Sequence, residues 1–177
     1  MERETTCCFT GHRPDKLPWR DDEKDPRCVA LKERLTAAVE EAYDKGMRHF
    51  ICGMARGADF YFCEAVLSLR ERRPGVTVEA ALPCEEQAAR WKERDRNRYF
   101  SLVAQCDYET MVQHHYDKGC MLRRDRYMVD RSAMIIAVYG GVLGGTMYTL
   151  AYAMKKGLEV NILDVEVEKQ QTTGGKT

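Results

Sequence analysis

Residues 133–157 join three patterns in a fixed order: an apolar run, a cluster of glycines and an amphipathic segment. The apolar run at 133–139 lacks polar alternation, which is typical of a parallel strand covered on both faces. Four glycines follow, and we expect Thr146 behind them to cap a helix that runs to residue 156. A strand, a glycine turn and a helix in this order aim backbone N–H groups at an anion. The pattern predicts half of a phosphate site or, alternatively, a turn that only joins the strand to the helix.

The alternation of strand and helix continues along the rest of the chain. Strands are predicted at residues 5–10, 49–52, 76–83, 108–113, 133–139 and 160–163. Helices are predicted at residues 27–45, 60–72, 85–104, 121–131 and 145–156. This order predicts an α/β sandwich with a mostly parallel sheet. We expect a single domain over residues 1–164 and a polar, disordered tail over residues 165–177.

The composition excludes several classes of protein. It is 44% hydrophobic and 32% charged, as in globular proteins. Lys plus Arg and Asp plus Glu total 28 each, so no net charge recruits nucleic acid or an anionic membrane. The start of the chain lacks a signal-peptide pattern, and no apolar run is long enough to span a bilayer. We therefore expect a cytoplasmic protein with no membrane partner.

Arginine and cysteine gather locally, but neither pattern predicts a site by itself. The arginines at 90–98 and 123–131 alternate with acidic residues, which favours solvated helix faces for most of them. The eight cysteines form no Cys-x-x-Cys pair and lie mostly in apolar runs, as buried, reduced cysteines do. A metal site with Cys8 and His12 is an open alternative that no spacing supports, so we predict neither a metal nor a cofactor.

Three loops with unusual chemistry leave the carboxyl ends of predicted strands, at residues 11–14, 53–59 and 140–146. In a parallel sheet these loops share one edge, and α/β proteins bind ligands at this edge where the strand order reverses. Their convergence favours the phosphate site over a simple turn. The candidate ligand-binding residues are Gly11, His12, Arg13, Gly53, Met54, Ala55, Arg56, Gly57, Asp59, Gly144, Gly145 and Thr146.

Several of these residues also have a structural interpretation. Arg13 is always charged and fork-shaped, so it is a better phosphate ligand than His12, since a loop histidine is more often structural. Asp59 stands where a helix begins, so capping competes with a contact to a ribose hydroxyl. Arg56 is expected to be exposed between its two glycines. Glu64, on the following helix, is either a solvent-facing carboxylate or a catalytic one.

Four segments together resemble the YpsA-like family of proteins: residues 10–14 (Thr-Gly-His-Arg-Pro), 53–59, 127–130, and 144–153 with its Gly-Gly-Thr start and Tyr-Ala end. This family belongs to the SLOG superfamily of Rossmann-like domains, which also contains DprA and the LOG phosphoribohydrolases. The resemblance covers about residues 5–163. It implies a Rossmann-like three-layer sandwich and a nucleotide or nucleotide-sugar ligand of the ADP-ribose type, and it leaves the reaction open.

The chain departs from the LOG pattern at one position. LOG enzymes carry a Pro-Gly-Gly-x-Gly-Thr-x-x-Glu motif with a catalytic glutamate, and the resemblance puts Thr149 in its place. A threonine cannot act as the carboxylate that stabilises a ribosyl cation. Hydrolysis of an N-glycosidic bond would therefore need Glu64 or Asp130 as the carboxylate, with His12 as the proton donor.

Three hypotheses about function follow. The first is a cytoplasmic protein that senses or carries a nucleotide-derived small molecule without a cofactor. The second is a nucleotide hydrolase of the phosphoribohydrolase type, so the sequence leaves open whether the protein is an enzyme. The third is DprA-like binding of single-stranded DNA through residues 90–98, but the balanced charge argues against a nucleic-acid partner. The resemblance also implies a possible homodimer, since members of the superfamily often pair through helices.

Overall fold

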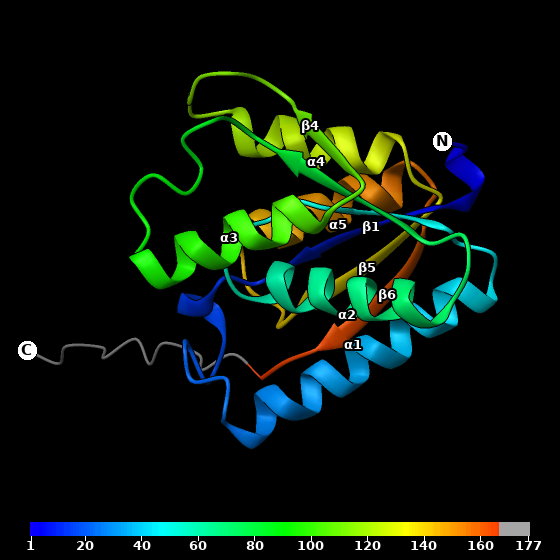
Figure 1. Cartoon of the computed structure of the whole chain (residues 1–177), viewed down its shortest axis with the longest axis horizontal. Helices are drawn as coiled ribbons and strands as arrows, with labels where there is room; N and C mark the ends of the chain where they lie inside the picture. Colours follow the sequence, from blue (N-terminus) through cyan, green and yellow to red (C-terminus); the bar gives the residue numbers. More distant parts are fainter. Residues whose placement is uncertain (167–177) are drawn as a thin grey trace, which may run out of the picture.

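A computed structural model describes residues 1–166 of the chain, and it contains one parallel sheet with helices on both faces (Figure 1). The strands are β1 (Thr6–Gly11), β2 (His49–Cys52), β3 (Thr77–Leu82), β4 (Tyr108–Met111), β5 (Met134–Tyr139) and β6 (Glu159–Asp164). The helices are α1 (Pro26–Asp44), α2 (Ala58–Arg72), α3 (Glu93–Gln105), α4 (Cys120–Asp130) and α5 (Gly145–Lys155), with short 3-10 turns η1 (Arg3–Thr5) and η2 (Pro14–Lys16). The predicted α/β, Rossmann-like fold is confirmed.

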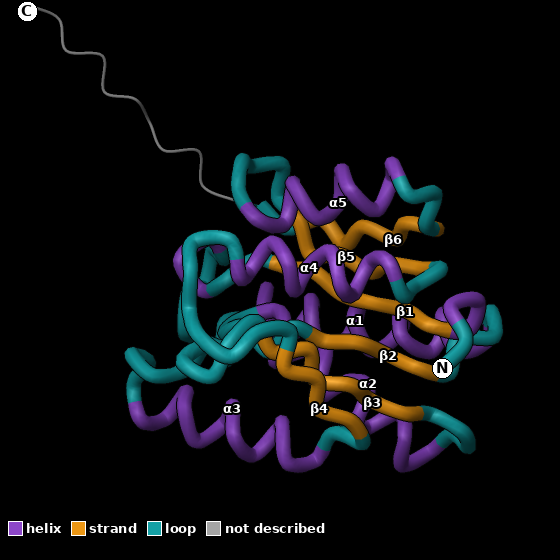
Figure 2. Tube along the Cα trace, turned by 90° about the horizontal axis from the view of Figure 1, so that it is seen from above, coloured by secondary structure: helices purple, strands orange, loops and turns teal. Residues whose placement is uncertain are grey.

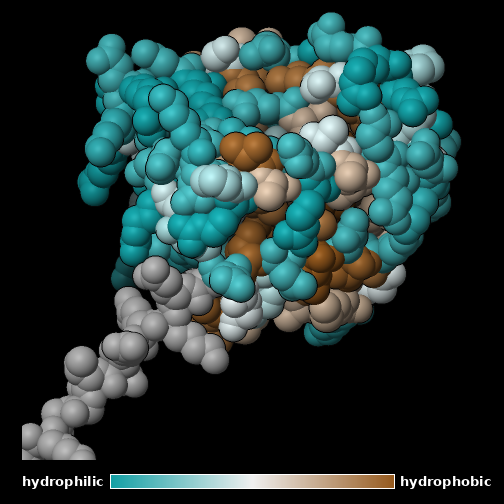
Figure 3. All heavy atoms as spheres, turned by 90° about the horizontal axis from the view of Figure 1, so that it is seen from below, coloured by the Kyte–Doolittle hydropathy of each residue, from teal (hydrophilic) through white to brown (hydrophobic). Residues whose placement is uncertain are grey.

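Two hydrophobic clusters hold the three layers together. Successive side chains of a strand point to opposite faces, so Phe9 of β1 enters the larger cluster and Cys8 enters the smaller one. The larger cluster is formed with α1, α2 and α3, and the smaller one with α4 and α5. Figure 2 shows α4 and α5 together on one face of the sheet. Figure 3 shows the face on the α1 side, where hydrophilic residues surround smaller hydrophobic areas.

The order in which the chain adds strands to the sheet reverses between β1 and β5. The order is β4-β3-β2-β1-β5-β6, so the chain moves outward from β1 to β4 and then returns to the other side of β1. Thr10 pairs with Ala137 and Gly11 with Val138, so the carboxyl ends of β1 and β5 lie next to each other. The loops after these two strands diverge to opposite faces of the sheet, and this leaves a crevice between them.

The prediction of one helix over residues 85–104 was wrong in its first part. Helix α3 begins only at Glu93, and residues 85–90 form turns. The buried side chain of Gln87 donates hydrogen bonds to the carbonyls of Gly53 (3.2 Å) and Met54 (2.6 Å). The backbone N–H of Glu85 donates to the carbonyl of His114 at 2.9 Å. These hydrogen bonds to distant loops hold residues 85–87 in a non-helical conformation, and they override the local helical preference.

The predicted tail at residues 165–177 lies almost entirely outside the described residues. Within residues 1–166, no helix is both long enough and apolar enough to cross a membrane. All eight cysteines are free thiols, and only Cys106 is not fully buried.

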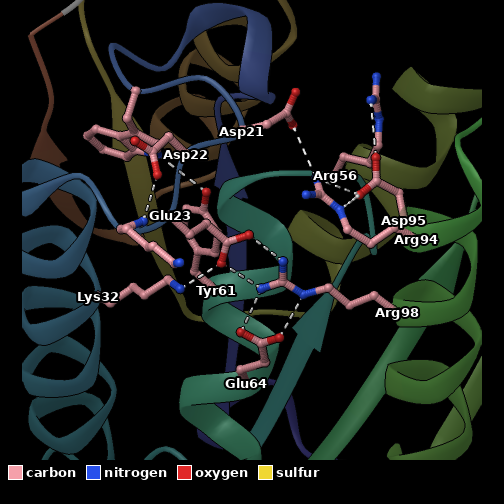
Figure 4. Close-up of polar contacts among 12 residues, drawn as sticks. Asp21, Asp22, Glu23, Lys32, Arg56, Tyr61, Glu64, Arg94, Asp95 and Arg98 are labelled. Carbon is pink, nitrogen blue, oxygen red and sulfur yellow. Dashed lines mark hydrogen bonds and ion pairs between the residues drawn. The ribbon is translucent and has the colours of Figure 1, made fainter.

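Arg98 of α3 joins three segments through its guanidinium group (Figure 4). It donates two hydrogen bonds to Glu64 of α2, at 2.8 and 2.9 Å, and two to Glu23 in the loop before α1, at 2.5 and 3.0 Å. Lys32 of α1 also donates to Glu23 at 2.6 Å. Because the group is planar and offers a fixed set of donors, it can satisfy both carboxylates at once.

Replacing Arg98 with methionine should lower the free energy of unfolding by about 1–3 kcal/mol, because the two half-buried carboxylates lose their shared partner. Urea unfolding followed by circular dichroism measures the change. Arg94→Met is the matched control on the same helix, since the Arg94 side chain is 70% exposed. Its effect should stay within about 0.5 kcal/mol. Equal effects in the two variants would contradict the structural role of Arg98.

Candidate functional site

A cavity of about 340 Å³ lies at the crevice between the ends of β1 and β5. Its walls come from the end of β1 and the following loop, the loop before α2, the inner side of α4 and the start of α5. Seven of the predicted ligand-binding residues line it: Gly11, His12, Arg13, Ala55, Asp59, Gly145 and Thr146. The three predicted loops therefore do meet at one edge of the sheet.

His12 connects two of these loops. The residue is 2% exposed, and its Nε2 accepts a hydrogen bond of 2.9 Å from the N–H of Gly140. Burial, with a smaller contribution from the positive charge of Lys16, lowers the pKa of His12 to about 4. The ring is therefore neutral at pH 7, and Nε2 has no proton to give. This geometry supports the structural interpretation of His12 over its proposed role as a proton donor.

Two cations stand at the mouth of the cavity. Arg13 is exposed and, within residues 1–166, forms no ion pair. Nζ of Lys16 donates a hydrogen bond of 3.0 Å to the carbonyl of Leu143. Gly144, with φ of +152°, makes this approach possible, because a Cβ there would lie 2.1 Å from Nζ of Lys16. The glycine turn thus brings an ammonium group to the start of α5.

The start of α5 faces the same cavity. The prediction that Thr146 caps this helix was wrong: the N-cap is Gly144, and Thr146 is the second helical residue, with 7% exposure. No side chain caps the helix. The first N–H groups of a helix have no acceptor within it, so those of α5 remain available to a ligand. A Cβ on Gly145 would meet no atom within 4 Å, so this wall of the cavity is open.

The loop at residues 53–59 serves mainly to pack the site together. A Cβ on Gly53 would lie 2.5 Å from Nη1 of Arg124, and a Cβ on Gly57 would lie 2.8 Å from the carbonyl oxygen of His12. Gly57 also has φ of +86°, a conformation that favours glycine. Met54 is fully buried. None of these three residues lines the cavity, and the two glycines permit close contacts behind it.

Two aspartates and an arginine form a charged wall of the cavity, in which Asp59 and Arg124 are buried. The carboxylate of Asp59 accepts a hydrogen bond of 2.9 Å from the N–H of Ala55, and burial raises the pKa of Asp59 to about 6. Arg124 is 4% exposed and donates from Nε to Asp125 at 2.6 Å. It also donates from Nη1 to the carbonyl of Gly53. The wall therefore carries one cation between two carboxyl groups.

A solvated face was predicted for most of the arginines at residues 123–131, and Arg124 is an exception because it is buried. Sequence reasoning missed Arg124 and Asp125 as site residues. A signal was present, because Cys120, Arg124 and Met128 follow one another at a spacing of four and share one side of α4. An arginine within an otherwise apolar stripe has to be paired when it is buried. That spacing identifies Arg124 as a buried, partnered cation.

Three other candidates lie outside the cavity. Arg56 lies 3.6 Å from Asp95 and its guanidinium stands over the ring of Trp91, and Glu64 is held by Arg98 (Figure 4). Asp130 accepts a hydrogen bond of 2.7 Å from the hydroxyl of Tyr152. The structure therefore brings neither Glu64 nor Asp130 to His12. Within the described part of the chain, no group of three or more metal-ligating side chains is present.

The family model described as the YspA SLOG family matches residues 7–167. The chain belongs to this family. The SPbeta prophage-derived protein YoqJ of Bacillus subtilis is 30% identical over 145 residues, which cover 75% of this chain and 85% of YoqJ. The protein YpsA of the same organism is 28% identical over 154 residues, which cover 84% of this chain and 83% of YpsA. Membership of this family supports a nucleotide- or DNA-binding role in general and specifies no ligand or activity.

Two solved structures of DNA processing protein A share the fold. The Helicobacter pylori protein, described with its single-stranded DNA binding mode, has a TM-score of 0.62 and 17% identity over 94% of this chain and 68% of its own. The Streptococcus pneumoniae protein has a TM-score of 0.61 and 13% identity over 94% of this chain. Our chain spans about half, 52%, of that protein. At these identities the likeness concerns the fold alone.

His12 and Asp59 should give opposite contributions to the pH dependence of stability. With a folded pKa of about 4, His12 binds a proton only in the unfolded chain between pH 4 and its ordinary 6.5, so its contribution rises with pH. With a folded pKa of about 6, Asp59 holds a proton only in the folded chain above its ordinary 3.8, so its contribution falls with pH.

Urea unfolding between pH 4.5 and 6 should therefore show a steeper rise of stability with pH in Asp59→Asn and a shallower one in His12→Gln. Each full proton difference changes the slope by about 1.4 kcal/mol per pH unit. Both replacements keep a hydrogen-bond acceptor. Asp44→Asn, at an exposed position, should keep the wild-type slope. Unchanged slopes in both test variants would contradict the assigned environments.

Proposed function

We propose that this protein binds a nucleotide-derived small molecule of the ADP-ribose class as a sensor or carrier, and that it holds the phosphate in the cavity at the ends of β1 and β5. The observation that carries the proposal is that the uncapped start of α5 shares this cavity with Arg13 and Lys16. Helix N–H groups and flexible cations are complementary to a phosphate. The cavity volume of about 340 Å³ lies in the range of small-molecule sites.

The position of the charges favours a small ligand over a DNA strand. A DNA-binding surface needs a continuous basic track, but acidic residues interrupt the arginines at residues 90–98, and two of these arginines are held by internal contacts. Arg98 pairs with Glu23 and Glu64, and Arg96 donates to the carbonyl of Trp91 at 2.9 Å. Arg13 and Lys16, by contrast, line one cavity together, which suits a compact anion.

A charge at the start of α5 should abolish ligand binding without unfolding the chain. In Gly145→Asp, the added carboxylate occupies the open space beside the helix N-terminus and repels a phosphate. We expect at least about tenfold weaker binding of ADP-ribose or AMP, measured by ligand-observed NMR and calorimetry. Gly145→Ala is the control, because its methyl group meets no atom within 4 Å and it adds no charge. Unaltered affinity in the aspartate variant would remove this loop from the site.

Asp59 supports a second candidate function, hydrolysis of an N-glycosidic bond. It lines the cavity, and its raised pKa of about 6 leaves about a tenth of the carboxyl group protonated at pH 7, far more than for an ordinary aspartate. A buried carboxyl group of this kind can protonate a leaving base. This interpretation assigns the acid to Asp59, because Glu64 and Asp130 are held elsewhere.

If the protein hydrolyses its ligand, Asp59→Asn should lower the rate of base release from AMP or ADP-ribose at least about 100-fold while nucleotide affinity changes little. Chromatography of the free base over hours measures the rate. Glu64→Gln, which lies outside the cavity, is the control and should keep the wild-type rate. No base release by the wild-type protein across a nucleotide panel would exclude hydrolysis and leave the binding proposal intact.

A further inference from the structure

A second cavity, of about 540 Å³, lies between α4 and α5 and adjoins the first. Met121, Asp125 and Gly145 line both cavities, so the two spaces meet at these residues. Figure 2 shows α4 and α5 running side by side on the same face of the sheet. We call this second cavity the α4–α5 groove. A ligand anchored at the start of α5 therefore has a direct path into it.

The α4–α5 groove has a different chemistry from the first cavity. Leu122 of α4 is 42% exposed and Tyr148 of α5 is 60% exposed, and both line the groove. Tyr152, one turn further along α5, also lines it, and its ring has the guanidinium of Arg126 at 5.5 Å. Aliphatic and aromatic side chains on two walls form a slot suited to a flat ring, and aromatic faces stack well on nucleobases.

Asp125 stands where the two cavities meet. One carboxylate oxygen pairs with Nε of Arg124 at 2.6 Å, and the other lies 3.0 Å from the hydroxyl of Thr149. Its side chain is 14% exposed, so it is fixed in position but still reached from the cavities. A carboxylate has about four acceptor sites. The remaining sites can accept hydrogen bonds from a sugar diol, as acidic residues do for ribose in other α/β nucleotide sites.

We propose that the ligand is a 5′-ribonucleotide or its derivative, with its phosphate at the start of α5, its ribose hydroxyls on Asp125 and its base in the α4–α5 groove. This inference rests on the proposed function for the position of the phosphate. Phosphate, sugar and base follow one another in the same order as the cations, Asp125 and Tyr148. Thr149 lies beside Asp125 and is four residues, about 6 Å along the helix axis, beyond Gly145. This distance matches the separation of the phosphate and the hydroxyls in a ribose 5-phosphate.

Binding of four ligands to the wild-type protein tests the order of these subsites. Calorimetry with AMP, GMP, CMP or UMP should show, for at least one nucleotide, about tenfold tighter binding than ribose 5-phosphate, because only the nucleotide fills the α4–α5 groove. The 2′-deoxy form of that nucleotide should bind about three- to tenfold more weakly, because it lacks one donor for Asp125. Inorganic phosphate should be the weakest ligand.

Two pairs of variants locate the base and the sugar. Tyr148→Ala should weaken the preferred nucleotide about tenfold and leave ribose 5-phosphate unchanged. Met154→Ala, which removes a 56% exposed side chain of α5 outside the groove, should change neither affinity. Asp125→Asn should reduce the difference between the ribonucleotide and its deoxy form. Thermal unfolding checks that the Asp125→Asn variant is folded. If it is not folded, the comparison of the ribonucleotide with its deoxy form on the wild-type protein still tests the sugar subsite.

The possible results separate the two proposals. If ribose 5-phosphate binds as tightly as every nucleotide, the base subsite is wrong and the phosphate site stands. If no phosphate-bearing ligand binds, both proposals are wrong. If Tyr148→Ala changes the mass measured by sedimentation but not nucleotide affinity, the α4–α5 groove is a contact between two copies of the chain, and the subsite proposal is overturned.

Discussion

The hydrogen bond from the N–H of Gly140 to Nε2 of His12 fixes the relation between the two loops on which the site depends. Strands β1 and β5 are neighbours in the sheet, but their loops leave in opposite directions. A direct contact is therefore needed to hold a crevice of constant shape between them. The buried ring of His12 supplies this contact. The backbone carbonyl oxygen of His12 also accepts a hydrogen bond from the N–H of Ala58 at the start of α2. One residue thus ties three loops together.

A buried cation completes this arrangement on the other side. Arg124 is almost inaccessible to solvent, and burial of an unpaired guanidinium would cost several kcal/mol. The charge is compensated by Asp125 and by the carbonyl of Gly53, with Asp59 nearby in the same cavity wall. Because Gly53 has no side chain, the guanidinium lies directly against the loop after β2. The same cluster that stabilises the loop therefore leaves two carboxyl groups facing the cavity.

The sequence was sufficient for those features that local patterns determine. The strand predicted at residues 49–52 matches β2 at both ends, because its apolar run is bounded by polar residues and a glycine. The start of α3 was not predictable in the same way, because Gln87 folds onto carbonyls more than 30 positions away in sequence. The charges at residues 123–131 suggest a solvated face, although the spacing of four from Cys120 to Arg124 and Met128 indicates a buried side, and in the structure Arg124 is buried where α4 packs against the sheet. Local periodicity predicts elements, while long-range hydrogen bonds decide their ends and their functional side chains.

Thr149 shows how the same limit affects inference about chemistry. Taken alone, a threonine at the position of the LOG glutamate removes the carboxylate from this edge of the site. In the folded chain, the hydroxyl of Thr149 lies 3.0 Å from the carboxylate of Asp125, which α4 supplies from the opposite side of the cavity. A carboxylate is therefore present beside that position, carried by a different helix and oriented by Arg124. A sequence motif describes the residues of one segment, but the side chains of a site come from several segments. The chemistry of this site thus depends on the pairing of α4 with α5, and substitutions on either helix alter the same carboxylate.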